Sequence, residues 1–422
     1  MLHADFLIRD TREILTCAGP APFAGQRQGV VSSVRGGSIA ALAGRIVSVG
    51  PAEAVEAAIT LTPDARVVDG SQYSIVPGFV DAHTHAIYAG DRQGELRQRL
   101  TGATYAEIAA AGGGILSTVL ATRAASEDAL VEQSLMRLEE MLSAGTTTCE
   151  VKTGYGLTLD SEMKMLRAAR RLERMQPMDL VMTFMGAHEV PPEYRSRRGA
   201  FVDLIVNEMI PAVVAEGIAD WCDVFCEAGV FTPAEAERIL RAGAARGLTP
   251  RIHADQLGAS GGSQVAARVG ARSADHLIFI PPDGIEAMAR AGVTATLLPS
   301  AAFYLKLGRF APARALIAAG VPVALATDVN PGGGFSPSMP FALSLACFSM
   351  HLTFEEALVA STINGAWSLD RAADVGSLET GKQMDAVLVR GDAVNLIRNG
   401  APSIAAVVKR GLIVRGEDAT RE

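Results

Sequence analysis

The chain has 422 residues, of which 49% are hydrophobic and 20% are charged, which excludes an intrinsically disordered or fibrous protein. Its formal net charge is −8 and it contains no basic run, which argues against a nucleic-acid partner, so that an anionic substrate would need a local cationic pocket. The length fits a barrel of about 250 residues with an accessory domain.

The N-terminus carries charges among its apolar residues and lacks the long apolar segment of a signal peptide. No later stretch approaches the run of about 20 apolar residues that a membrane span needs. Five cysteines, an odd number scattered along the chain, do not suggest a disulfide framework. A reducing cytoplasm is therefore the simplest location.

Both ends of the chain contain short apolar runs that are typical of β-strands. Near the N-terminus, Ser38–Leu42 and Arg45–Val49 flank Ala43-Gly44, which predicts a hairpin. Near the C-terminus, Ala386–Val389 and Ile404–Gly411 are similar apolar runs. We expect the two ends to fold together as one small β domain.

The middle of the chain alternates β-rich runs with Ala-rich amphipathic stretches such as Glu127–Ser143, Ser161–Arg174 and Pro233–Arg246. This alternation predicts a parallel sheet with helical crossovers, an α/β fold. Eight such units would form a (β/α)8 TIM barrel, whose active site lies at the C-terminal ends of the strands. The predicted strands are Gly78–His85, Thr146–Lys152, Leu180–His188, Trp221–Glu227, Thr249–His253, Ser273–His276, Val293–Pro299 and Pro322–Asp328.

Polar residues close seven of these eight strands, and five of the seven histidines are among them. A random scatter of histidines would rarely give this pattern, so it marks the barrel mouth as the site. The strand-end residues are, in chain order, His83, His85, Glu150, Lys152, His188, Glu227, His253, His276 and Asp328.

The first strand ends on two histidines, His83 and His85, which point to the same face because residues i and i+2 of a strand do so. His253 and Asp328 close two other strands at the same mouth. Three imidazoles and one carboxylate suit one Zn²⁺ or Fe²⁺ ion and leave a position for a water that the ion acidifies.

The same residues carry a family resemblance. Pro77–His85, His253, His276 and Asp328, together with Gly376–Ala386 near the C-terminus, resemble the metal-dependent amidohydrolase superfamily. The resemblance implies a hydrolase barrel over residues 76–365 and a composite β-sandwich built from residues 1–75 and 366–422.

Dinuclear members of that superfamily have a carboxylated lysine at the end of strand four. This chain has Glu227 there, so the resemblance favours a single metal ion. Lys152 ends strand two instead, where we expect a buried ion pair with Glu150 or a neighbouring carboxylate.

Further stretches are similar to the imidazolonepropionase family within that superfamily. The resemblance implies hydrolytic ring opening of 4-imidazolone-5-propanoate to N-formimidoyl-L-glutamate in histidine degradation, by a homodimer that binds a small anionic heterocycle and neither nucleic acid nor membrane. The stretches are Tyr88–Arg92, Gly112–Ile115, Glu150–Leu157, Gly186–Glu189 and Asp328–Gly332.

The predicted substrate contacts follow the chemistry of that ligand. Arg92 can bind the propanoate tail, because a guanidinium pairs with a carboxylate through two parallel hydrogen bonds. The resemblance adds the hydroxyl groups of Tyr105 and Tyr155, the second of which lies between two glycines in a loop. His188 could bond the ring, and Asn330 offers an amide to a ring nitrogen or carbonyl.

For the proton transfers we expect Asp328 or His276 to take the proton of the attacking water; His276 could also polarise the substrate carbonyl. Some family members have a glutamate three residues after the strand-five histidine, but this chain has Gln256. An amide cannot transfer a proton, so Gln256 can only orient water or substrate. Asp255 is a less favoured substitute because its side chain should point away from the face of His253.

Gly112–Gly114 lacks the spacing of a dinucleotide-binding loop, and we expect it to be a mobile flap. Two other functions stay open. One is a related mononuclear aminohydrolase that deaminates a purine, pyrimidine or triazine. The other is a non-catalytic relative used for interaction, although such proteins typically lose metal ligands that this chain keeps.

Overall fold

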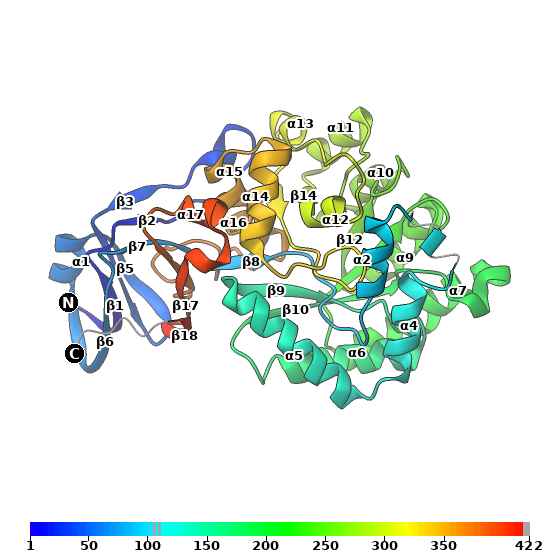
Figure 1. The fold of residues 1–422 in the computed structure, drawn as a ribbon, viewed down its shortest axis with the longest axis horizontal. Coiled ribbons are helices and arrows are strands. Elements are labelled where there is room, and N and C mark those ends of the chain that lie inside the picture. The colour runs from blue at the N-terminus through cyan, green and yellow to red at the C-terminus, as the bar shows by residue number, and fades with distance from the viewer. Residues whose placement is uncertain (104–106, 109–110, 417–422) are drawn as a thin grey trace.

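Eight parallel strands of the middle region form one sheet in sequence order. The structure, a computed structural model, describes residues 1–103, 107–108 and 111–416. The sheet closes just beyond its strands, where Asp328 N donates to His83 O at 3.1 Å and His85 N donates to Val329 O at 2.9 Å. The predicted barrel is therefore confirmed (Figure 1). Its strands are β8 (Phe79–Asp81), β9 (Thr146–Lys152), β10 (Asp179–Ala187), β11 (Trp221–Cys226), β12 (Thr249–Ala254), β13 (Ser273–His276), β14 (Thr294–Leu297) and β15 (Val323–Leu325).

The two strands that meet at the closure are shorter than predicted. β8 ends at Asp81, so His83 and His85 lie in the segment that follows it, and Asp328 lies three residues beyond the end of β15. The φ angle of Asp328 is 53°, a left-handed conformation that is incompatible with an extended strand. The site is therefore built from residues just past the strands.

Helices cover the outside of the barrel (Figure 1). The predicted helix Glu127–Ser143 is confirmed as α5, and the other two are confirmed with shifted ends. In the part of the chain that is described, no helix has the length and apolar character needed to cross a membrane. The helices of the barrel region are α2 (Gln93–Leu100), α4 (Ile115–Ala124), α5 (Glu127–Ser143), α6 (Leu159–Leu172), α7 (Arg198–Leu204), α8 (Ile210–Glu216), α9 (Pro233–Ala244), α10 (Gly262–Val269), α11 (Pro282–Ala291), α12 (Pro299–Tyr304), α13 (Ala313–Ala318), α14 (Met339–Met350), α15 (Phe354–Ala360) and α16 (Ile363–Ser368).

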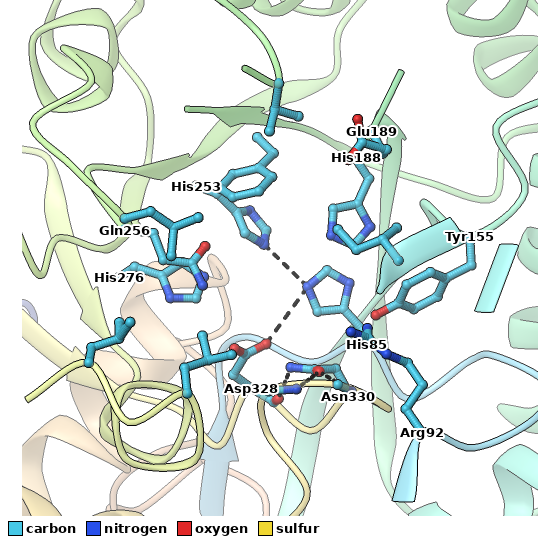
Figure 2. A pocket seen from close by; sticks show the side chains of 18 residues that line it. His85, Arg92, Tyr155, His188, Glu189, His253, Gln256, His276, Asp328 and Asn330 are labelled. Atoms are coloured by element: carbon cyan, nitrogen blue, oxygen red, sulfur yellow. Dashed lines mark hydrogen bonds and ion pairs between the residues drawn. The ribbon is translucent and has the colours of Figure 1, made fainter. Parts of the chain in front are cut away.

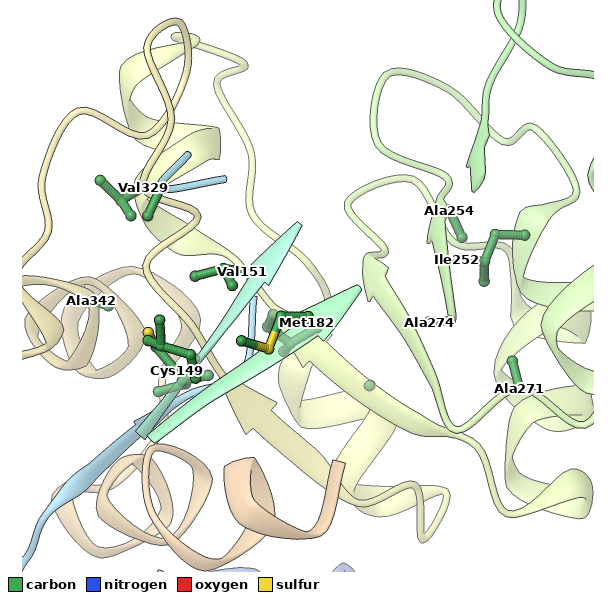
Figure 3. Packing of buried hydrophobic residues seen from close by; sticks show 14 of the residues in the cluster. Cys149, Val151, Met182, Ile252, Ala254, Ala271, Ala274, Val329 and Ala342 are labelled. Atoms are coloured by element: carbon green, nitrogen blue, oxygen red, sulfur yellow. The ribbon is translucent and has the colours of Figure 1, made fainter. Parts of the chain in front are cut away.

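The C-terminal half of β9 alternates between apolar and charged residues. Cys149 and Val151 of β9 are buried in the main hydrophobic cluster, part of which Figure 3 shows. Glu150 and Lys152 of the same strand are equally buried but point the other way. Lys152 Nζ lies 3.8 Å from Asp275 Oδ2 of β13, a strand four places away in the sheet, so these charged side chains occupy the barrel interior.

The two ends of the chain fold together, as predicted. A four-stranded and a six-stranded sheet share a hydrophobic core, and the six-stranded sheet combines strands from both termini. The predicted hairpin is confirmed, with Leu42 paired to Arg45. The first sheet contains β5 (Arg45–Pro51), β4 (Gly37–Leu42), β1 (Leu2–Arg9) and β6 (Ile59–Asp69); the second contains β18 (Leu412–Gly416), β17 (Ile404–Lys409), β16 (Ala386–Arg390), β7 (Tyr73–Pro77), β2 (Glu13–Leu15) and β3 (Ser33–Arg35). Two short helices, α1 (Ala52–Ala58) and α17 (Asn395–Arg398), accompany these strands.

One residue, Gly78, joins the terminal sheet to the barrel, because β7 ends at Pro77 and β8 begins at Phe79. Gly78 N donates to Asp385 O of the terminal domain at 2.9 Å, and Phe79 N donates to Gly145 O of the barrel at 3.0 Å. The first barrel strand is thus a direct continuation of the terminal sheet. The boundaries at residues 75/76 and 365/366 stay predictions.

Candidate metal centre and substrate pocket

Four predicted metal ligands meet at the mouth of the barrel. The Nε2 atoms of His85 and His253 face one another at 3.2 Å. Asp328 Oδ1 lies 3.6 Å from His83 Nε2 and 3.8 Å from His85 Nε2. One ligand atom from each of the three histidines falls within 4.8 Å of the others. The spacing suits several ligands around one ion.

These residues also have the chemistry of a cation site. Among the described residues, His83 Nε2 and His85 Nδ1 are buried without a hydrogen-bond partner. Burial, followed by neighbouring positive groups, lowers the pKa of both imidazoles well below the usual value, so both rings are neutral at pH 7. The Nε2 atoms of His85 and His253, 3.2 Å apart, need a cation or a proton between them. The donor set therefore fits a divalent metal ion.

Carboxylates behind the histidines fix their orientation. Asp275 Oδ2 lies 2.7 Å from His83 Nδ1, and Asp223 Oδ1 lies 3.1 Å from His253 Nδ1. Each contact places the ring proton on Nδ1 and leaves Nε2 as the ligand atom. Neither aspartate was predicted from the sequence, although each lies in a buried strand and alternates with apolar residues.

A buried charge network forms the floor of the site. Lys152 Nζ donates to Glu150 Oε1 at 2.8 Å and to Asp223 Oδ2 at 2.6 Å, so the ion pair predicted for Lys152 is confirmed. Arg251 adds a second cation, with Nη2 3.4 Å from Asp275 Oδ2. Burial opposes ionisation of Asp223, but His253 and Lys152 outweigh it and hold its pKa well below the usual value. Two cations thus bind the carboxylates that orient His83 and His253.

His276 lies beside the predicted ligands. One ring nitrogen falls within 4.8 Å of ligand atoms of both His83 and Asp328, so the geometry also allows it to be a ligand. Its φ angle is 76°, and its Nδ1 atom is buried without a hydrogen-bond partner among the described residues. Burial lowers the pKa of this imidazole well below its usual value. A neutral His276 can accept a proton.

Asp328 is deeply buried at the same point. Burial raises the pKa of its carboxyl group to about 7 when no metal ion is bound. The roles predicted for Asp328 and His276 stay predictions.

A cavity opens beside these ligands (Figure 2). Five of the six predicted substrate-binding residues line it, and Tyr105 falls outside the described residues. Glu189 also lines the cavity and was given no role in the sequence analysis. The predicted residues in the cavity wall are Arg92, Tyr155, His188, Gln256 and Asn330.

Arg92 is held by a carboxylate of its own. Its Nε and Nη2 donate to the two oxygens of Glu95 at 2.9 and 2.7 Å, and the guanidinium packs against Gly332. A Cβ atom at position 332 would lie 2.0 Å from Arg92 Nη1, so any other residue there would displace the guanidinium.

The side chain of Asn330 is largely engaged in hydrogen bonds within the loop that follows β15. Its Nδ2 donates to Asp328 O at 2.7 Å, and its Oδ1 accepts from Gly332 N at 2.8 Å and Gly333 N at 2.6 Å. The amide group that was predicted to contact the substrate thus also binds the backbone of its own loop. Its acceptor oxygen already serves two backbone amides.

Gln256 and Asp255 follow His253 with different orientations. Gln256 lines the cavity, and its backbone amide donates to Glu227 Oε2 at 3.1 Å. Asp255 instead accepts from the amides of Ser260 at 2.8 Å and Ser263 at 3.2 Å, so it points away from the site as predicted. Only Gln256 of this pair can meet a substrate.

The glycine-rich segment lies against Glu95. Gly114 N donates to Glu95 Oε1 at 2.8 Å, which ties the segment to the carboxylate that holds Arg92. Ile115, the next residue, lines the cavity. The segment thus lies at the edge of the cavity, where a flap would be expected. Its mobility stays a prediction.

Comparison with known proteins gives one consistent family. Residues 74–414 match the profile of the Amidohydrolase family. The chain is 48% identical over 424 residues to an imidazolonepropionase of Symbiobacterium thermophilum, covering 100% of both chains. It is 49% identical over 384 residues to an imidazolonepropionase of Geobacillus kaustophilus, covering 90% of each.

Solved structures agree on the architecture. The guanine deaminase of E. coli superposes with a TM-score of 0.74 at 16% identity, covering 97% of this chain and 99% of that one. An adenosine deaminase of Xanthomonas campestris with bound zinc gives a TM-score of 0.69 at 19% identity, covering 100% of this chain and 95% of that one. At these identities the likeness shows the fold alone.

Proposed function

The chain belongs to the amidohydrolase family and, within it, to the imidazolonepropionases, and from this premise we propose that it hydrolyses 4-imidazolone-5-propanoate to N-formimidoyl-L-glutamate. The observation that carries the proposal is one cavity that combines a metal-ligand set with a buried arginine. Arg92 fits the anionic tail of the substrate, and the ligand set lies where its ring would be attacked.

The metal centre accounts for the activation of water. His83, His85, His253 and Asp328 would hold one divalent ion, which when bound acidifies water and polarises a carbonyl group. The proposed ion is Zn²⁺ or Fe²⁺, because three imidazole nitrogens and one carboxylate are typical of both.

In the proposed reaction, one side chain then transfers a proton from the attacking water to the ring nitrogen. Asp328 or His276 accepts it as the water oxygen bonds to the lactam carbonyl carbon. The same group returns a proton to the ring nitrogen as the ring C–N bond breaks, so that one water is consumed and no other product is released. Tyr155 and His188 would hold the ring, while Arg92 holds the tail.

The test is an assay with 4-imidazolone-5-propanoate that follows loss of its ultraviolet absorbance. We expect turnover that a chelator abolishes and added metal restores, and about one equivalent of transition metal in the purified protein. Less than about a tenth of an equivalent of metal would contradict the catalytic reading. Release of ammonia from guanine, cytosine or a triazine, without ring opening, would favour an aminohydrolase instead.

Three further features belong to the proposal. The resemblance to the family supports a homodimer. The small anionic substrate and the chain's negative charge support the absence of nucleic-acid and membrane partners. All five cysteines are free thiols, which supports a cytoplasmic location.

A further inference from the structure

The loop between β9 and α6 carries Tyr155 into the cavity, and one carboxylate holds this loop. Glu162 Oε2 accepts from Gly154 N at 3.0 Å, and its Oε1 accepts from Gly156 N at 2.8 Å and Leu157 N at 2.7 Å. The side chain of Glu162 is fully buried. Three backbone amides on both sides of Tyr155 therefore converge on one side chain.

The loop needs such support because its backbone conformation is unusual. Leu157 has a φ angle of 53°, in the left-handed region that a leucine rarely adopts. Gly154 has a φ angle of 109°, and a Cβ atom there would lie 2.9 Å from His188 Nδ1. Glycine adopts such a φ angle readily, but the conformation of Leu157 is costly for a leucine, and the hydrogen bonds to Glu162 stabilise it.

A cation holds the opposite side of the same loop. Arg123 Nε donates to Gly156 O at 2.7 Å, and its Nη2 donates to Leu157 O at 3.2 Å. The amides thus bind a carboxylate and the carbonyls bind a guanidinium. This arrangement selects one conformation of the loop.

Two cavity residues depend on that conformation. The ring of Tyr155 is packed between those of Tyr88, at 6.1 Å, and His188, at 5.2 Å between centroids. His188 Nδ1 is 3.1 Å from Gly154 O, and this contact places the proton on Nδ1 and turns Nε2 away from the loop. The ring of His188 in turn stacks on that of His85, with centroids 4.8 Å apart.

We propose that Glu162 is a positioning residue for substrate binding, which acts through the loop that presents Tyr155 and fixes His188. This inference rests on the proposed function, because Tyr155 and His188 are its predicted substrate contacts. Glu162 does not line the cavity, so its effect reaches the substrate only through the backbone of the loop.

The test is Glu162→Gln in the full-length metal-loaded enzyme. Glutamine keeps the shape but replaces one acceptor oxygen with an NH₂ donor, which would oppose one or two of the three amides. We expect KM for 4-imidazolone-5-propanoate, and the calorimetric Kd for N-formimidoyl-L-glutamate, to rise about tenfold, with a smaller change in kcat and unchanged metal content. Arg123→Met, which releases the same loop from its other side at a less buried position, should raise KM in the same way even if Glu162→Gln folds poorly.

A second comparison separates positioning from general stability. Glu356 is also buried and accepts a backbone amide, that of Thr353 at 2.9 Å, but it does not line the cavity. Glu356→Gln should lower the melting temperature and leave KM unchanged. In a Tyr155→Ala background the effect of Glu162→Gln on KM should shrink, because one of the two side chains through which it acts is gone.

Two results would overturn the inference: an unchanged KM in Glu162→Gln, or an effect that multiplies in full with that of Tyr155→Ala. Its failure is distinct from failure of the proposed function. If the parent enzyme does not turn over 4-imidazolone-5-propanoate, the proposed function fails; if the parent does and the variant binds equally well, only the role of Glu162 fails.

Discussion

Asp328 is the residue on which the proposed chemistry depends most. It contributes a carboxylate oxygen near His83 and His85 and lines the substrate cavity. The sequence marks it by its place after an apolar strand. The left-handed backbone that turns it into the mouth could not be read from that pattern, because it results from closure of the barrel against His83 O.

Asp328→Asn should abolish turnover and leave the fold intact. The amide is a poorer metal ligand and cannot accept the proton of the attacking water, so we expect kcat to fall by about 10²- to 10⁴-fold. Steady-state kinetics and circular dichroism check this. A kcat within tenfold of the parent would rule out the proposed role.

Arg92→Ala should raise KM far more than it lowers kcat, since an anchor for the tail of the substrate binds ground state and transition state alike. Arg92→Lys keeps the charge but loses the fork that pairs with Glu95, so its KM should lie between those of the parent and Arg92→Ala. Initial-rate kinetics give both values. An unchanged KM in Arg92→Ala would place this residue outside the binding site.

At the scale of elements, neighbouring strands supply the proposed metal ligands and the groups that orient them. β12 provides His253, β11 provides the Asp223 that orients it, and β13 provides the Asp275 that orients His83. The ligands were predicted because histidines at strand ends are conspicuous. The aspartates were not, because their role depends on contacts across the barrel between residues distant in sequence.

Asp275→Asn should weaken metal binding by about 10- to 100-fold, because His83 would lose the carboxylate that fixes its tautomer. Competition with a chelating dye measures the dissociation constant without any assay of activity. Asp179→Asn is a matched control, since that aspartate is also buried but contacts the terminal domain. Equal metal affinities in the parent and Asp275→Asn would contradict the role of Asp275.

At the scale of the whole molecule, the barrel and the terminal domain are joined by buried charges. Lys409 of β17 donates to Asp179 Oδ2 at 3.0 Å and to Asp385 Oδ2 at 2.6 Å. Asp179 also contacts Arg371 and Arg410. The hydrophobic periodicity and the turn residues between segments predicted the barrel and the terminal β domain, because both signals are local in the sequence. The ion pairs between the barrel and the terminal domain could not be predicted, because no local sequence pattern indicates which strand end will face which sheet.

Asp179→Asn should lower the free energy of unfolding by about 2 kcal/mol at pH 7. Burial opposes the charge of Asp179, but Lys409, Arg410 and Arg371 hold its pKa below the usual value. Its contribution is therefore complete above the unfolded pKa of about 3.9 and is lost as pH falls through the lower folded pKa. Urea unfolding of both proteins should show a constant difference near neutrality that shrinks below about pH 4. A difference that persists undiminished in acid would contradict this assignment.

Only one residue, Gly78, separates β7 of the terminal sheet from β8 of the barrel, and this restricts how the two domains can be combined in chimeras. Pro77 pairs with Ala386 in the terminal sheet, and the chain reaches the first metal ligand six residues later, at His83. A slip of one residue in that pairing would turn His83 and His85 to the wrong side of the barrel wall. The terminal domain and the barrel are therefore coupled through the register of this strand pair. A chimera would retain a working metal centre only if the graft kept the register of β7 against β16.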